Sequence, residues 1–250
     1  MRKIAIINQK GGVGKTTTVL NIAHALALQG KRILVLDMDP QAHLTAGLNV
    51  NPRDCTGLDA ALLDGESLKA HMLEVRNNLF LVPAGVRLCD VEILGAAEGR
   101  GERLRASLLP EQDWDFILID SPPSAGMLVM NSLYAVDEIL IPVSADYFGL
   151  QGVSYLMSTL KNFEDKLGHT LQHRFVVTRF HRRRTLGKEV LEKLQAYFPH
   201  AVLQTVIREL AALAVSPGFG QTIFEYDASC PAAKDYATLA EDIVQDRTKP

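Results

Sequence analysis

The stretch "KIAIINQKGGVGKTTTVLNIAHALA", residues 3–27, contains three successive patterns that together decide the fold. Its first six residues are apolar and β-branched apart from their ends, which is typical of a buried strand. A glycine-rich loop follows, after which Val19, Ile22 and Leu26 recur at helical spacing. A strand, a glycine loop and a helix in this order form the context that a phosphate-binding loop requires.

The residue types of this loop supply the chemistry for holding a phosphate. Glycines let backbone N–H groups turn toward an anion, and a helix N-terminus adds unpaired donors and a partial positive charge. Lys15 is expected to reach the β- and γ-phosphates, and the Thr16 hydroxyl is expected to bind Mg²⁺. A turn with a chance lysine is the alternative, which the flanking strand and helix disfavour. The other loop residues predicted to bind nucleotide are Lys10, Gly11, Gly12, Val13, Gly14 and Thr17.

Apolar runs that resemble strands recur along the 250 residues, and helical patterns separate most of them. This alternation predicts an α/β fold, with a doubly wound, mostly parallel sheet that carries helices on both faces. The length suits one domain spanning residues 1–250. The predicted strands are residues 3–8, 32–37, 79–84, 115–120, 138–143, 174–180 and 201–207.

Composition excludes some broad classes of protein. The net charge of −3 gives no global basicity, so any nucleic-acid site must be a local patch. The three cysteines, Cys55, Cys89 and Cys230, lack metal-like spacing, which favours reduced structural thiols in a cytoplasmic protein. No signal-like segment opens the chain, and no apolar run reaches membrane-spanning length.

Acidic residues stand at the ends of two predicted strands, the edge of a parallel sheet where ligands bind. Asp120 ends "DFILID" and precedes "SPPS", an arrangement in which an Asp organises Mg²⁺, often through water; an Asp that caps a turn is the alternative. Asp37 and Asp39 lie in "DMDPQ", where either residue is placed to orient the attacking water or a water bound to magnesium. The separate motifs therefore converge on one site.

Four segments, taken together, resemble the ParA/Soj partition ATPases, within the deviant-Walker group that also contains MinD. They are "KGGVGKTTTVLNIAHALA", "VLDMDPQAHLTAGL", "FILIDSPPS" and "IPVSADYFGLQGVSYL". The similarity continues through "VTRFHRRRTLGKEVLEKL" and "SPGFGQTIFEYD", so it covers essentially the whole chain. Without an extra N-terminal DNA-binding domain, the chain resembles the small ParA type.

The resemblance implies a role for Lys10, which a phosphate-binding loop does not otherwise need. In that family the matching lysine reaches across a dimer interface to the nucleotide of the partner, and ATP lies between two subunits. A lysine supplied by the partner offsets the charge of a buried triphosphate only in the dimer. The resemblance also implies that Asp39 positions the hydrolytic water, as a catalytic residue beside Lys10 and Lys15. Thr16, Asp37 and Asp120 are the expected magnesium residues.

The family's ATP-bound dimer binds DNA without sequence preference, and a partner protein stimulates its hydrolysis. The local counterpart here is "RFVVTRFHRRRTLGK", residues 174–188, which contains no acidic residue. A basic cluster of this kind can contact phosphates without reading bases. An ordinary solvated loop and helix start is the alternative. The predicted DNA-binding residues are Arg182, Arg183, Arg184 and Lys188.

The chain departs from the family's pattern at one segment. Where many relatives read "TVIPRNVRLAEAPSYG", residues 205–220 read "TVIRELAALAVSPGFG". Arg208 replaces the proline, and Ala212 replaces an arginine that belongs to the DNA-binding surface in some relatives, which puts DNA affinity in doubt. Pro217 is the residue carried over to the nucleotide pocket. Apolar residues of this segment, Leu210 among them, mark either a partner contact or a buried segment.

These observations favour a slow, partner-stimulated ATP hydrolase that dimerises on ATP and positions cargo on the nucleoid in the cytoplasm. The cargo is a chromosome or plasmid partition complex or a protein assembly, and a ParB-like protein or cargo adaptor is the expected activator. One alternative is an ATP-bound scaffold with negligible turnover. A MinD-like positioning factor is another, although the acidic C-terminal end "YATLAEDIVQDRTKP" makes a poor membrane anchor. Metal-cluster carriers are disfavoured because the chain has no Cys-x-x-Cys pair.

Overall fold

An eight-stranded sheet runs through the computed structural model, which describes residues 1–93, 99–108, 113–168 and 170–249. The strand order is β3-β4-β2-β5-β1-β6-β7-β8, and every neighbouring pair is parallel except β3 with β4. The strands are β1 (Arg2–Ile6), β2 (Ile33–Asp37), β3 (Leu73–Arg76), β4 (Leu79–Val82), β5 (Phe116–Asp120), β6 (Glu138–Ser144), β7 (Gln172–Phe180) and β8 (Val202–Arg208).

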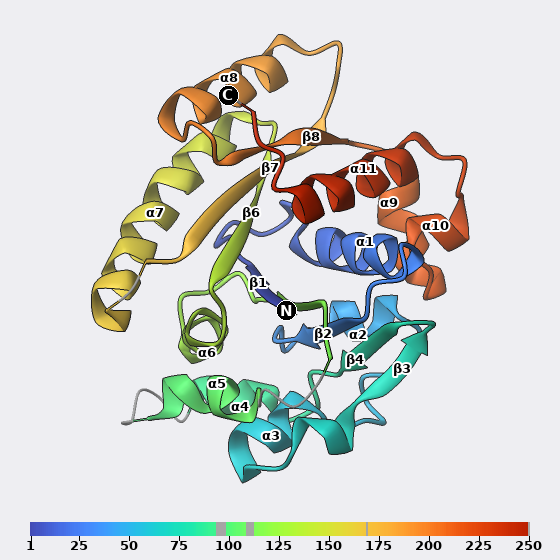
Figure 1. Ribbon diagram of the computed structural model, residues 1–250, viewed down its shortest axis with the longest axis vertical. Coiled ribbons are helices and arrows are strands. Elements are labelled where there is room, and N and C mark those ends of the chain that lie inside the picture. The colour runs from blue at the N-terminus through green and yellow to red at the C-terminus, as the bar shows by residue number, and fades with distance from the viewer. Residues whose placement is uncertain (94–98, 109–112, 169, 250) are drawn as a thin grey trace.

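Helices cover both faces of this sheet, with α1 and α11 on one side and α6 and α7 on the other (Figure 1). The α-helices are α1 (Lys15–Leu28), α2 (His43–Gly47), α3 (Leu58–Asp64), α4 (Leu88–Ile93), α5 (Arg103–Ser107), α6 (Met127–Ala135), α7 (Tyr147–Leu167), α8 (Thr185–Tyr197), α9 (Ala211–Val215), α10 (Ile223–Tyr226) and α11 (Pro231–Gln245). The 3-10 helices are η1 (Leu68–His71), η2 (Arg100–Glu102) and η3 (Ser216–Phe219).

The two faces of the sheet form two hydrophobic cores, and successive strand residues alternate between them. On β1, Ala5 packs into the core beneath α6 and α7, whereas Ile4 and Ile6 pack into the core beneath α1 and α11. A central strand that is buried on both faces needs an almost continuous apolar sequence. This requirement explains why the central strands could be recognised from short apolar runs, and it confirms the predicted α/β fold class.

All seven predicted strands are present, and one strand was not predicted. β3 has the sequence Leu-Glu-Val-Arg, pairs antiparallel with β4, and lies partly exposed at the edge of the sheet. A short edge strand gains little from burial, so its sequence carries no long apolar run. Its register depends on the neighbouring strand rather than on its own pattern.

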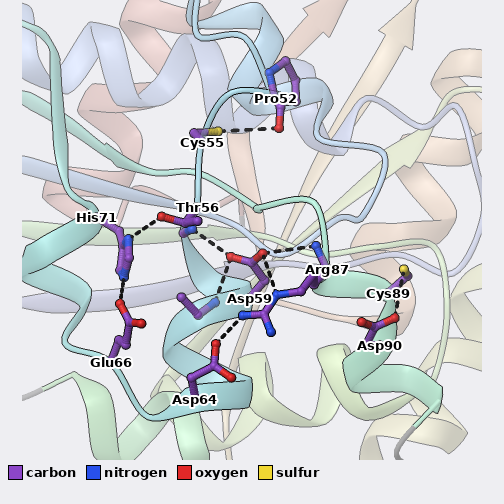
Figure 2. A network of polar contacts seen from close by, with 12 residues as sticks. Pro52, Cys55, Thr56, Asp59, Asp64, Glu66, His71, Arg87, Cys89 and Asp90 are labelled. Carbon is purple, nitrogen blue, oxygen red and sulfur yellow. Dashed lines mark hydrogen bonds and ion pairs between the residues drawn. The ribbon is translucent and has the colours of Figure 1, made fainter.

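A polar network fixes the segment between α2 and α4, on the β4 side of the sheet (Figure 2). The buried carboxylate of Asp59 accepts hydrogen bonds from the backbone N–H groups of Gly57 (2.8 Å) and Arg87 (3.1 Å). The Arg87 guanidinium also contacts Asp64, and a second chain of contacts joins Thr56 to His71. These contacts hold α3 against the turn that precedes α4, outside the nucleotide loop.

The three cysteines are free, as expected for reduced thiols. Cys55 and Cys89 lie near the network of Figure 2, where their sulfurs contact the Pro52 carbonyl oxygen and the Asp90 carboxylate, each at 3.7 Å. Cys230 is buried at the start of α11.

The parallel topology brings the carboxyl ends of β1, β2 and β5 together. Asp37 and Asp120 are register partners at the ends of β2 and β5, and Ile6 at the end of β1 is the register partner of Asp120 on its other side. The glycine loop leaves β1 at this point and leads into α1. The predicted convergence of the motifs is therefore present in the fold.

Candidate functional site

The glycine loop has the backbone geometry that its residue types predict. Gly12 and Gly14 have φ angles of 74° and 88°, in the left-handed region that favours glycine. A Cβ atom at either residue would meet nothing within 4 Å, so conformation rather than crowding requires glycine there. Gly14 is the N-cap of α1, whose first turn has neither a side-chain cap nor an acidic residue. The helix N-terminus therefore presents unpaired N–H donors to an anion.

Two side chains that the sequence analysis did not single out hold this loop in place. The Asn8 side chain donates to the Pro142 carbonyl oxygen at 2.8 Å and accepts from the Lys10 backbone N–H at 2.9 Å. The Thr178 hydroxyl, on β7, donates to the Val13 carbonyl oxygen at 2.8 Å. Both side chains are buried. Asn8 had a local signal, as a polar residue ending an apolar run, whereas nothing local distinguishes Thr178.

Lys15 is a buried cation. Its exposed fraction is 7%, and no described carboxylate lies within salt-bridge distance of its Nζ atom. Burial lowers the pKa of Lys15, and the negative charges of Asp120 and Asp39 offset part of this effect. A buried ammonium without a close counter-ion is unfavourable, and the phosphates of a bound nucleotide would supply that counter-ion.

Asp120 is a buried acid without a hydrogen-bond partner on either carboxylate oxygen. Burial raises its pKa well above the ordinary value, and the neighbouring Asp37 raises it further. The Thr16 hydroxyl and Lys15 lower it, although the hydroxyl makes no hydrogen bond of ordinary geometry to the carboxylate. Unpartnered carboxylate oxygens beside a threonine hydroxyl fit a hard cation such as Mg²⁺.

The two acids after β2 have different surroundings. Asp37 is fully buried, and its Oδ2 atom accepts from the Thr45 backbone N–H at 2.8 Å and the Thr45 hydroxyl at 2.6 Å. Burial raises the pKa of Asp37 to about 6, and the two bonds from Thr45 oppose this rise. Asp39 lies at the cavity wall and accepts from the Gln41 N–H at 2.9 Å. Asp39 is thus placed to meet a ligand, and Asp37 supports the loop behind it.

Two cavities meet at the glycine loop and share Gly12, Gly14 and Thr17. One has a volume of about 390 Å³ and a polar wall that includes Lys15, Thr16, Asp39, Gln41 and His43. The other has a volume of about 300 Å³ and is lined largely by apolar residues, among them Val13, Ile207, Leu210, Leu213 and Tyr236. A polar cavity and an apolar cavity joined at a phosphate loop suit the phosphates and the base of a nucleotide.

No group of three or more His, Cys, Asp or Glu side chains that would hold a metal occurs among the described residues. Mg²⁺ is commonly held by one or two protein groups, substrate phosphates and water. Thr16 and Asp120 are the protein groups whose surroundings fit this pattern.

Lys10 points away from its own glycine loop. Its Nζ atom lies 2.7 Å and 2.9 Å from the two carboxylate oxygens of Asp146, the N-cap residue of α7, and 3.1 Å from the Ser144 hydroxyl. The side chains of Lys10 and Asp146 remain 30% and 42% exposed. Within one chain, this lysine is therefore held at the end of β6 and is not directed at the site that Lys15 serves.

Pro217 lies in η3, where its Cβ would be 3.5 Å from a Cβ atom built on Gly47. The apolar cavity is lined by the preceding residues of the same segment, including Leu210. A direct contact of Pro217 with nucleotide stays a prediction. The segment that departs from the family pattern thus forms a cavity wall, with Leu213 buried and Leu210 packed on the core, while Val215 is 41% exposed.

The predicted DNA-binding residues gather at the start of α8. Arg182, Arg183 and Arg184 form an exposed turn, hereafter the arginine loop, and Lys188 is exposed in the first turns of the helix. Two other cations of the same stretch are paired with acids from distant parts of the chain. Arg174 binds Asp246, and Arg179 binds Glu209. The sequence could not reveal this neutralisation, because both acids follow in later segments.

The last helix packs within the fold. Tyr236, Leu239 and Ile243 of α11 are buried against α1 and β8. None of the helices formed by the described residues has the length and apolar character needed to cross a membrane.

Comparisons with known proteins agree with these observations. A family model described as an AAA domain matches residues 1–173. The chain is 38% identical to the chromosome-partitioning ATPase Soj of Thermus thermophilus over 98% of this chain and 96% of that protein. It is 37% identical to the sporulation initiation inhibitor protein Soj of Bacillus subtilis, over 96% and 97% of the two chains.

The solved structure of a differently named protein is also similar. Cobyrinic acid a,c-diamide synthase from Mycobacterium smegmatis, with a bound ATP analogue and magnesium, gives a TM-score of 0.85 at 27% identity. The match covers 100% of this chain and 98% of that one. The likeness extends over the whole fold, including the strand ends where the two cavities lie.

Proposed function

Because the chain belongs to the ParA/Soj family of P-loop ATPases, we propose that it binds ATP with Mg²⁺, dimerises on ATP and positions cargo through DNA. The observation that carries this proposal is the pair of buried, opposite charges at the loop. Among the residues that the structure describes, Lys15 has no close counter-ion and Asp120 has no hydrogen-bond partner. Magnesium and a triphosphate supply both partners at once.

The phosphates are assigned to the glycine loop. Backbone N–H groups of Gly12–Thr17 and the Lys15 ammonium would hold them, with Thr16 and Asp120 holding magnesium. Asp37 is assigned to the support of this magnesium site through Thr45. The apolar cavity beside Leu210 and Leu213 is assigned to the base.

Hydrolysis is assigned to Asp39, which lies on the wall of the polar cavity and orients the attacking water. Turnover is proposed to be slow, far below the ~10 s⁻¹ of a median enzyme, because such a protein works as a timer. A partner protein, ParB-like or a cargo adaptor, is proposed to accelerate it.

Dimerisation is assigned to Lys10. The residue is held by Asp146 and Ser144 in the single chain, at a partly exposed position from which a second chain can recruit it. In the dimer it would give up these contacts for the triphosphate of the partner, where its charge is needed most. ATP would thereby become part of the interface.

DNA binding is assigned to the arginine loop and Lys188, whose exposed charges suit contacts with phosphates. Two such patches in one dimer gain from effective concentration, so DNA binding is proposed to follow ATP binding. Cytoplasmic protein would then be found on the nucleoid.

The main rival is a scaffold that binds ATP and holds a protein partner with negligible turnover. A MinD-like role is the second rival, and the burial of the apolar residues of α11 disfavours it. Phosphate release from the purified chain with Mg²⁺ and ATP, measured with and without duplex DNA, distinguishes the proposed ATPase from the scaffold. Slow release that stops with EDTA or Asp39→Ala supports the ATPase, whereas ATP binding without any release, even with the activating partner, supports the scaffold.

A further inference from the structure

Glu209, one of the residues that depart from the family pattern, joins the ends of β7 and β8. Its Oε1 atom accepts from Arg179 Nε at 2.8 Å and Nη2 at 2.6 Å. Its Oε2 atom lies 2.6 Å from His181 Nε2. The Glu209 backbone N–H also donates to the Phe180 carbonyl oxygen at 3.3 Å. One residue therefore contacts three successive residues of the turn that leaves β7.

That turn has an unusual backbone. Arg179 has φ 53°, a left-handed conformation that is disfavoured for residues other than glycine. The register between β7 and β8 also shifts between Val177 and Phe180. A disfavoured conformation persists only where surrounding contacts hold it, and Glu209 supplies side-chain contacts to Arg179 and His181 here.

The arginine loop follows directly from this turn. Residues 182–184 are exposed, and α8 begins at Thr185. The first turn of α8 is packed closely on the end of β7, since a Cβ atom at Gly187 would lie only 3.2 Å from the Phe180 ring. The direction in which the arginines project is therefore set by residues 179–181.

The contact between Glu209 and Arg179 also borders the apolar cavity. Arg179, Arg208, Glu209 and Leu210 all belong to its wall, next to the glycine loop. Arg208 is in turn fixed to Asp235 of α11 by contacts of 2.6 Å and 2.8 Å. A ligand that fills this cavity therefore contacts a segment that meets residues 179–181 through the side chain of Glu209 and through the pairing of Arg208 with Phe180.

Electrostatic attraction alone does not explain the arrangement. The side chains of Arg179 and Glu209 are 53% and 36% exposed, and an exposed ion pair stabilises a protein little. Glu209 also places a negative charge beside a loop proposed to bind DNA, which by itself weakens such binding. Because the charge of Glu209 opposes DNA binding while its contacts hold the residues before the arginine loop, its role is better explained as positioning that loop.

We propose that Glu209 is a positioning residue, which holds the arginine loop in its DNA-binding geometry and makes that geometry respond to nucleotide in the apolar cavity. The inference rests on the proposed function and adds to it a route from nucleotide to DNA. Such a route requires only that the segment 207–211 and the turn 179–181 move as one unit.

The first test uses the sign of a change in DNA affinity. Glu209→Ala removes a negative charge, so electrostatics alone makes duplex DNA bind more tightly to the protein loaded with a non-hydrolysable ATP analogue. Loss of positioning makes DNA bind more weakly, and we expect weakening of about threefold to tenfold by fluorescence anisotropy. Unchanged or tighter binding would overturn the proposal.

Two matched variants separate charge from position. Glu209→Gln keeps the side-chain length and an acceptor for Arg179, so DNA affinity should return to at least that of the parent. Asp246→Asn removes one negative charge from the Arg174 ion pair on the same strand, far from the loop, and should not weaken DNA binding. Weakening by Asp246→Asn equal to that of Glu209→Ala would contradict a positional role.

A second test needs no DNA. Trypsin cleaves after arginines of the exposed loop, and ADP fills the cavity without requiring the dimer. We expect ADP to slow cleavage at residues 182–184 severalfold in the parent and in Asp246→Asn, but not in Glu209→Ala. ADP protection that survives Glu209→Ala overturns the inference. If Glu209→Ala loses the ADP protection but the parent protein binds no DNA, the coupling between the cavity and the arginine loop stands, and the DNA part of the proposed function is refuted.

Discussion

Lys15 begins α1 and Asp120 ends β5, whereas Arg179 and Arg208 lie at the ends of β7 and β8, along the same edge of the sheet. The first two are buried charges without close partners in the described chain. The second two are partly exposed, and each is paired with an acid, Glu209 and Asp235 respectively. The charges at the glycine loop therefore lack partners that a ligand can supply, whereas the charges at the β7–β8 end are paired within the protein itself.

This difference indicates how the two regions work. In the empty protein, the buried charges at the glycine loop are energetically unfavourable, and bound magnesium and nucleotide would remove this penalty. Nucleotide binding there should therefore be tight and should depend on single residues. The β7–β8 end is a network of modest contacts, whose loss should change geometry and DNA affinity by smaller amounts.

Lys15→Ala should abolish nucleotide binding, because it removes the cation placed at the β- and γ-phosphates. A loss of at least about 1,000-fold in ATP affinity, or roughly 4 kcal/mol, is expected by titration calorimetry. Lys69→Ala, at an exposed lysine far from the loop, serves as the control and should bind as the parent does. Retained affinity in Lys15→Ala would show that the lysine has been assigned wrongly.

The burial of Asp37 predicts a pH dependence. Because its folded pKa is about 6, above an unfolded value near 3.9, the folded chain binds more protons between these values. The contribution of Asp37 to the free energy of unfolding therefore falls as pH rises from about 4 to about 6, by up to ~3 kcal/mol.

The measurement is urea unfolding of nucleotide-free protein at several pH values. Subtracting the curve of Asp37→Asn isolates this residue from acids such as Glu225, whose pKa is lowered by its bond to Arg76 and which acts in the opposite direction. A difference between parent and variant that stays constant from pH 4 to pH 7 contradicts the account.

Two buried acids should respond oppositely to neutralisation. Asp120→Asn removes a charge without partners, so we expect the nucleotide-free protein to gain about 1–2 kcal/mol of stability while losing Mg²⁺-dependent ATP binding. Asp242→Asn removes a charge that accepts from Thr205 and Arg247, so we expect a loss of about 1–3 kcal/mol. Thermal unfolding compares them, and a loss of stability in both would refute the contrast.

Replacing Arg182, Arg183 and Arg184 together by alanine should weaken binding of duplex DNA roughly tenfold. The slope of log affinity against log salt concentration should become shallower by roughly 3, because each phosphate contact contributes about one. Arg53→Ala with Lys69→Ala and Lys234→Ala, three exposed cations elsewhere, controls for net charge. If the triple variant binds DNA as the parent does, the arginine loop is not the DNA site.

Local patterns correctly placed the glycine loop between a strand and a helix and Asp120 at a strand end, since these positions depend on residues adjacent in sequence. They also sufficed for the central strands, which are apolar because both faces are buried. Contacts between distant segments gave no such signal. Thr178 binds the loop from a strand 165 residues away, and Glu209 neutralises Arg179 from the next strand.

The predicted role of Lys10 belongs to a third category. The residue is conspicuous in the sequence, and the single chain shows it bound to Asp146 and Ser144. Its proposed ligand belongs to another subunit, so neither local pattern nor the fold of one chain contains the contact. Only the assembled dimer can test it.

The most direct test of the central claim is the mass of the ATP-bound protein measured by light scattering. Asp39→Ala protein, which retains ATP, should have twice the mass of the monomer with Mg²⁺ and ATP. The Lys10→Ala, Asp39→Ala protein should bind ATP and remain a monomer, because each triphosphate lacks the lysine of the partner subunit. A double variant that still dimerises on ATP would contradict a role for Lys10 across the interface, and one that no longer binds ATP would place its role within its own chain.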